Sequence, residues 1–187
     1  NYGIQVTLDA DGNGYPLAGD FYGWTSSVKV VGQGTVQQDL SVERILHLTS
    51  PFDNSNLAGS LTAGKDVHEG EQVTIAWDTL PEAAKYRLAI SLYTESPYQQ
   101  ISNIINATLT ETSYLASLPA VPEGQHYNLT LYADNANEVM VGQLMINYQN
   151  GKGWDYRFRT EAIATPTSKP TRTILEIKAI TPALYAS

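Results

Sequence analysis

The residue types best suited to chemistry gather in one acidic stretch near the start of the chain, DADGNGYPLAGD at 9–20. Counted from Asp9 as position 1, oxygen-bearing residues recur at positions 3, 5, 7 and 12, and Gly14 at position 6 permits a sharp bend. This is the spacing of a twelve-residue calcium loop, because Ca²⁺ takes six to eight oxygen ligands. The predicted ligands are Asp9, Asp11, Asn13, Tyr15 (through its backbone carbonyl) and Asp20.

Two features of this stretch set the kind of site that is expected. Position 12 is Asp20, not the longer bidentate Glu, so the last ligand is expected to be monodentate or to act through a water. The flanking sequence predicts strands, not helices, which indicates a structural site of about 0.1–1 mM affinity; Mg²⁺ suits it less well. The alternative is a plain hairpin turn at Asn13-Gly14 with solvated aspartates, and both interpretations stay open.

Aromatic residues form two clusters that could bind a ligand by stacking. GDFYGW (19–24) follows the acidic stretch, and GKGWDYRF (151–158) lies near the other end of the chain. Because side chains alternate along a strand, some of these rings are expected to face outward, where a sugar ring can stack. The candidates are Tyr22, Trp24 and Trp154; the alternative for each cluster is core packing.

Other chemistry finds little support in the sequence. There is no cysteine, and His47, His68 and His126 have no histidine at metal-ligand spacing, so we expect them to face solvent or lie at strand edges. No nucleophile-elbow, zinc-protease or phosphate-loop motif occurs, which predicts a non-catalytic protein. The net charge of −8 disfavours nucleic-acid binding. The sequence contains no run of about 18 apolar residues, so it predicts no membrane span.

Alternation with period two recurs along the chain and predicts an all-β fold. In the first part, strands are expected at 2–8, 26–31 and 35–48, with a turn at 32–34. After a Ser-, Asn- and Gly-rich stretch, a second series is expected at 71–77, 84–93, 106–118, 126–135 and 138–149, followed by candidates at 153–163 and 171–180. QQISNII (99–105) is the one candidate helix.

The second series resembles a fibronectin type III domain over about residues 68–150. Trp77 ends a strand as the core tryptophan of that family does, and LPEAAKYRLAI matches its next strand. Tyr127 in HYNLTLYADN is similar to the tyrosine-corner residue of that family, whose hydroxyl forms a hydrogen bond with the backbone a few residues earlier in the chain. The resemblance implies an antiparallel β-sandwich; the alternative is another sandwich with a buried Trp and Tyr.

The first 45 or so residues are similar to the later half of transthyretin-like, carboxypeptidase regulatory-like β modules of secreted bacterial proteins and lipoproteins. The matching pieces are VTLDADGNGYPLAGDFYGW, VKVV and TVQQDLSVERI. This resemblance implies a partial β-sandwich with a calcium loop of the kind found in EF-hands.

Together these patterns predict two antiparallel β-sandwich-like modules: 1–48, a linker at 49–65, a fibronectin type III/Ig-like unit at 66–160, and a tail at 161–187. We expect a calcium-stabilised spacer or adhesion module. Its expected location is extracellular, periplasmic or at a bacterial cell surface, and one expected form of the precursor carries a lipid anchor. Its partner would be a glycan or a surface protein, and 171–180 could exchange as a strand with a neighbouring molecule. The alternative is a carbohydrate-binding accessory domain of a secreted hydrolase.

Overall fold

The computed structural model describes residues 2–14, 17–29, 35, 37, 39–51, 53–55, 66–67, 72–144 and 157–160. These residues form strands and connections, with no helix among them. The first strands are β1 (Tyr2–Leu8), β2 (Phe21–Val28), β3 (Glu43–Ile45), β4 (Leu48–Ser50), β5 (Asp66–Val67) and β6 (Gln72–Trp77). The others are β7 (Lys85–Glu95), β8 (Tyr98–Leu109), β9 (Ser113–Ser117), β10 (Gln125–Asp134), β11 (Met140–Gln143) and β12 (Arg157–Thr160).

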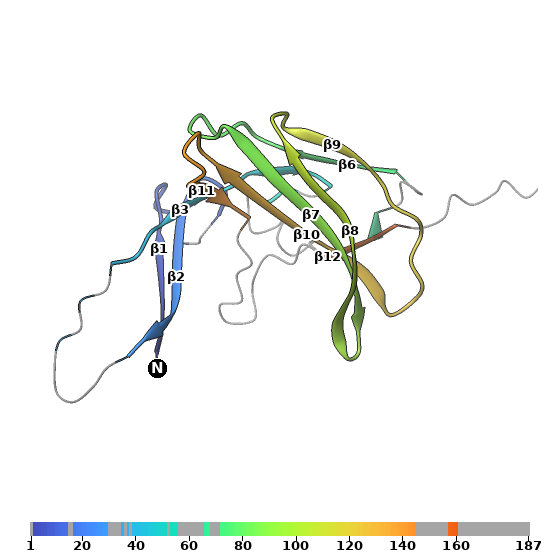
Figure 1. The fold of residues 1–187 in the computed structure, drawn as a ribbon, viewed down its shortest axis with the longest axis horizontal. Helices are drawn as coiled ribbons and strands as arrows, with labels where there is room; N and C mark the ends of the chain where they lie inside the picture. Colours follow the sequence, from blue (N-terminus) through green and yellow to red (C-terminus); the bar gives the residue numbers. More distant parts are fainter. Residues whose placement is uncertain are drawn as a thin grey trace, which may run out of the picture.

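Two sheets face each other and make a β-sandwich (Figure 1). The smaller has the order β4-β6-β9, and the larger contains β7, β8, β10 and β11 together with the remaining strands. Alternate residues of β6 and β10 are buried, so each strand turns one face toward the other sheet. The predicted all-β, sandwich-like fold is therefore confirmed.

The core lies between the sheets and is built from large aliphatic side chains around Trp77. Ile75, Leu88, Leu129 and Leu131 have no exposed surface, and each contributes about 1.5–3 kcal/mol by leaving water. Trp77 packs edge-on against Tyr86, with ring centroids 5.4 Å apart. Trp77, the core tryptophan expected from the sequence, is thus buried, and so is Tyr86.

The first strands join the larger sheet at its edge. β1 and β2 form an antiparallel hairpin, β2 pairs with β3, and β3 pairs in parallel with β11. In Figure 1 this hairpin stands at one side of the sandwich, next to β3 and β11. The predicted domain boundaries remain a prediction, but one hydrogen-bonded sheet runs through both parts of the chain.

The helix predicted at 99–105 is wrong, because these residues belong to β8. Ile90 and Ser91 are neighbours in β7, yet their partners in β8 are Ile105 and Asn103, so Ile104 is an extra, bulged residue. A second bulge makes Ile101 extra in the same way. The two insertions space the isoleucines as a helix would, at i, i+3 and i+4, and so hide the strand period.

Two predicted strands are divided because the chain changes sheets within them. The stretch 35–48 contains β3 in the larger sheet and the first residue of β4 in the smaller one, with a crossing at 46–47. The stretch 106–118 likewise contains the end of β8 and then β9. β2 also begins at Phe21, earlier than predicted, and the predicted strand at 171–180 and turn at 32–34 lie outside the described residues.

Candidate functional site

The acidic stretch forms the connection between β1 and β2, and its backbone folds around Asp9. The carboxylate of Asp9 accepts hydrogen bonds from the N–H groups of Gly12 (2.7 Å), Asn13 (3.2 Å) and Gly14 (2.6 Å). The bond from Gly14 outweighs the opposing effect of burial and, with the other two, holds the pKa of Asp9 below its ordinary value. Asp9 is therefore ionised at neutral pH and fixed in place.

Asp20 closes the same loop from the far end and is buried, with only 2% of its surface exposed. Its carboxylate accepts hydrogen bonds from the N–H of Ala10 and of Leu17, both at 2.8 Å. Its backbone carbonyl accepts from the N–H of Ile45 at 2.7 Å, and the N–H of Gly19 donates to the carbonyl of Ile45 at 2.9 Å. The loop is thus closed on itself and tied to β3.

The structure brings together three of the five predicted metal ligands. Carboxylate oxygens of Asp9, Asp11 and Asp20 lie within 4.8 Å of one another. Oxygens bound to one Ca²⁺ at about 2.3–2.6 Å can be no farther apart than about twice that distance, so this spacing admits a single ion. None of the ion pairs between described residues involves these carboxylates.

Asn13 lies beside this group and Tyr15 is outside the described residues. The side-chain nitrogen of Asn13 donates to Asp11 at 2.8 Å, so the amide stands next to the carboxylates. Gly12 and Gly14 have positive φ angles of 76° and 83°, which supply the bend that the sequence predicted at Gly14. The hard oxygen donors fit Ca²⁺, and no described residue supplies a soft ligand to the loop.

A groove opens next to β2, on the outer face of the larger sheet. We call it the Tyr22–Trp24 groove; its volume is about 470 Å³, and its lining is Tyr22, Trp24, Thr25, Asp39, Leu40, Ser41, Glu43, Met140 and Gln143. Tyr22 and Trp24 share this face because they are two residues apart on one strand, and 59% of the Trp24 surface is exposed. The predicted stacking residues therefore meet in one place, whereas Trp154 lies outside the described residues.

Glu43 stands across the strand pair from Tyr22 and carries the charge of the groove together with Asp39. The side-chain nitrogen of Gln143 donates to the Glu43 carboxylate at 3.2 Å. Partial burial raises the pKa of Glu43 above its ordinary value, and this effect exceeds the opposing hydrogen bonds. Sequence reasoning missed Glu43 and Gln143 as groove residues, because β2, β3 and β11 become neighbours only when the chain folds.

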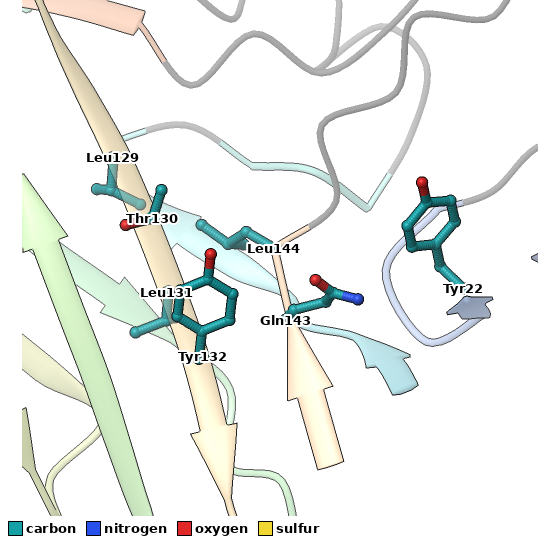
Figure 2. Close-up of a pocket in the computed structure, with 7 residues that line it drawn as sticks. All are labelled: Tyr22, Leu129, Thr130, Leu131, Tyr132, Gln143 and Leu144. Atoms are coloured by element: carbon teal, nitrogen blue, oxygen red, sulfur yellow. The ribbon is translucent and has the colours of Figure 1, made fainter. Parts of the chain in front are cut away.

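A smaller cavity of about 190 Å³ adjoins the groove and shares Tyr22 and Gln143 with it. Figure 2 shows the amide of Gln143 between the rings of Tyr22 and Tyr132, with Leu144 next to it and Thr130 farther along β10. Tyr132 pairs with Gln143 across β10 and β11, which places their side chains on the same face. The recessed surface therefore continues from β2 to β10.

The histidines are dispersed, as the sequence predicted, but one is not at the surface. His126 is buried under the rings of Tyr93 and Tyr98, with centroids 5.9 and 5.8 Å away. His47 contacts Asp53 and Asp78 on opposite sides of its ring, at 3.0 and 2.6 Å. His68 lies outside the described residues.

No protein-family model matches the chain, and no curated protein matches it. Among solved structures it is similar to an Fn3-like protein from Clostridium thermocellum, with 18% sequence identity over 55% of this chain and 88% of that one. The TM-score of this match is 0.29. The β-sandwich assignment rests on the strand pairing within the two sheets.

None of the described residues belongs to a helix with the length and apolar character needed to cross a membrane.

Proposed function

We propose that this chain is a non-catalytic β-sandwich module of a bacterial cell envelope or secreted protein, stabilised by Ca²⁺ and serving as a spacer or adhesion domain. The observation that carries the calcium site is the convergence of Asp9, Asp11 and Asp20. Three carboxylates in one short loop repel one another, and Ca²⁺ bound there would remove that repulsion. Asn13 and Tyr15 would complete the ligand set.

The position of the loop explains why an ion would stiffen the molecule. Leu17, inside the loop, is buried in the sandwich core, and Gly19 and Asp20 are hydrogen-bonded to Ile45 at the end of β3. Ordering the loop would therefore fix the β1–β2 hairpin against the sandwich. A spacer needs such a fixed orientation between its parts.

Thermal melting in millimolar Ca²⁺ and in chelator tests this proposal. We expect Ca²⁺ to raise the Tm of the native protein and Asp11→Ala to abolish the shift, because Asp11 is exposed and its loss leaves the core intact. Glu123→Ala is the control, since Glu123 is an exposed carboxylate in the β9–β10 connection. If Ca²⁺ leaves the Tm of the native protein unchanged, the loop is a plain turn and the calcium proposal is wrong.

The groove favours a second candidate function, a carbohydrate-binding accessory domain. Tyr22 and Trp24 line it together with Ser41, Glu43 and Gln143, which offer hydrogen bonds to hydroxyl groups. A glycan array tests this function, with binding expected for the native protein and lost in Trp24→Ala. Tyr98→Ala is the matched control, because Tyr98 on β8 is as exposed as Trp24, at 58%. Equal glycan binding by the native protein and Trp24→Ala would contradict a role for the groove.

A further inference from the structure

The charge of the Tyr22–Trp24 groove points to a more specific ligand. Among the described residues that line it, two carry carboxylates, Asp39 and Glu43, and none is Lys, Arg or His. Arg44, the nearest basic residue along β3, lies on the opposite face, where its guanidinium is 4.8 Å from the ring centroid of Phe21. The groove therefore presents negative charge beside aromatic rings.

The position of Glu43 makes this charge effective. Glu43 pairs with Tyr22 across β2 and β3, so its carboxylate lies beside the Tyr22 ring on the groove face. Gln143 donates to one of its oxygens, and no described cation pairs with it. A half-buried carboxylate without a counter-charge is stabilised by a cation that enters the groove.

The same sheet already uses this chemistry within the molecule. The guanidinium of Arg87 lies 5.0 Å from the ring centroid of Tyr132 and is also held by the carboxylate of Asp134, at 2.6 Å. A ring face and a carboxylate thus share one cation on the outer face of β7 and β10. The Tyr22–Trp24 groove offers the same two groups, a ring face and a carboxylate, and the part of its lining that the structure describes contains no basic side chain.

We propose that the Tyr22–Trp24 groove binds a small organic cation, an alkylated ammonium group held over the rings of Tyr22 and Trp24 and against the carboxylate of Glu43. Aromatic faces attract such cations through their quadrupole, and methylated ammonium groups lose little hydration on entering. The proposal uses the groove of the second candidate function but does not depend on sugars, nor on calcium.

Choline and its uncharged isostere 3,3-dimethyl-1-butanol test the proposal, with binding measured by calorimetry on the full chain. The two probes have the same shape, so their difference reports charge alone. We expect choline to bind at least about tenfold more tightly, since a cation–π contact with a carboxylate is worth one or two powers of ten in affinity. Equal binding of the two probes, or no binding of choline at millimolar concentration, would overturn the proposal.

Variants place the binding in the groove. Glu43→Gln keeps the shape and the Gln143 neighbour, and it should weaken choline about tenfold without affecting the isostere. Trp24→Phe should retain part of the affinity and Trp24→Ala should lose it, while Tyr98→Ala should leave it unchanged. Full choline affinity in both Glu43→Gln and Trp24→Ala would refute this site. If choline does not bind and a neutral glycan binds wild type and Glu43→Gln equally, the cation proposal is wrong and the carbohydrate function is supported.

Discussion

The hydroxyl of Tyr127 donates a hydrogen bond to the backbone carbonyl of Pro119, eight residues earlier in the chain, at 2.9 Å. The Tyr127 ring is buried in the core, and its hydroxyl therefore fixes the β9–β10 connection from inside. The hydroxyl of Thr160 on β12 donates to the same carbonyl at 2.6 Å. One carbonyl oxygen thus joins the end of the small sheet to β10 and β12.

Removing the Tyr127 hydroxyl should destabilise the protein by a moderate amount. Tyr127→Phe keeps the ring and loses one of the two bonds to Pro119, so we expect a loss of about 1 kcal/mol in urea unfolding. Tyr127→Phe combined with Thr160→Val should cost more than the sum of the two single variants, because the carbonyl then has neither bond. Tyr98→Phe is the control and should change the unfolding free energy by less than about 0.5 kcal/mol. A strictly additive double variant would contradict the shared role of this carbonyl.

This corner also shows what the sequence could reveal. Alternation and a Tyr-x-Leu-x-Leu-x-Ala pattern were enough to predict β10 and the buried side of Tyr127, because a single strand carries all the information. The part of β8 before Asn106 was missed, since the bulges at Ile101 and Ile104 replace the strand period by a helical one. Local patterns therefore predict regular strands and fail where pairing with a neighbour inserts a residue.

The candidate sites divide in the same way. The acidic loop is contiguous, so its spacing alone predicted that Asp9, Asp11 and Asp20 converge, which the structure shows. The groove joins Tyr22 to Gln143, more than a hundred residues away, through the parallel pairing of β3 with β11. Sequence patterns within one strand carry no information on which distant strand becomes its neighbour.

Asp20 should matter for stability even without Ca²⁺. Its buried carboxylate accepts from Ala10 and Leu17 with one oxygen each, and the amide of Asp20→Asn can accept only one of these bonds. We expect Asp20→Asn to lose about 1–3 kcal/mol of unfolding free energy in chelator, measured by urea denaturation. Asp11→Asn, at an exposed carboxylate in the same loop, should lose much less. Similar losses in the two variants would argue against a structural role specific to Asp20.

His47 should make stability depend on pH. Burial opposes its protonation, but Asp53 and Asp78 on either side of the ring outweigh burial and raise its pKa above the ordinary value of 6.5. Because the folded state holds the proton more tightly, the stabilisation is complete below about pH 6.5, while the aspartates are ionised, and is lost as the pH rises through the folded pKa. All three side chains are partly exposed, so the loss should stay below about 1 kcal/mol.

Urea unfolding between pH 5.5 and 8.5 measures this effect. His47→Asn should give a flatter profile over that range, because the titrating group is gone while the aspartates remain. A native profile that rises through the same range would mean that the pKa of His47 lies below 6.5 in the folded protein. Titration of the His47 ring by NMR would then show that directly.

Gly23 should be irreplaceable at the seam between β2 and the backbone at 41–42. A Cβ built on Gly23 would overlap the carbonyl oxygen of Ser41 and stand 3.0 Å from a methyl carbon of Val42. Backbone cannot yield as a side chain does, so Gly23→Ala should push β2 away from these residues and cost about 1–3 kcal/mol of unfolding free energy. Tyr22 and Trp24 flank Gly23 and Ser41 lines the groove, so choline affinity should fall as well. Gly3→Ala on β1 is the control for stability, because its added Cβ would meet its nearest neighbours, the Thr25 carbonyl oxygen and the Trp24 ring nitrogen, at an ordinary 3.7 Å, and it should leave the unfolding free energy unchanged. If Gly23→Ala were as stable as Gly3→Ala, the close approach of β2 to Ser41 would not exist in solution.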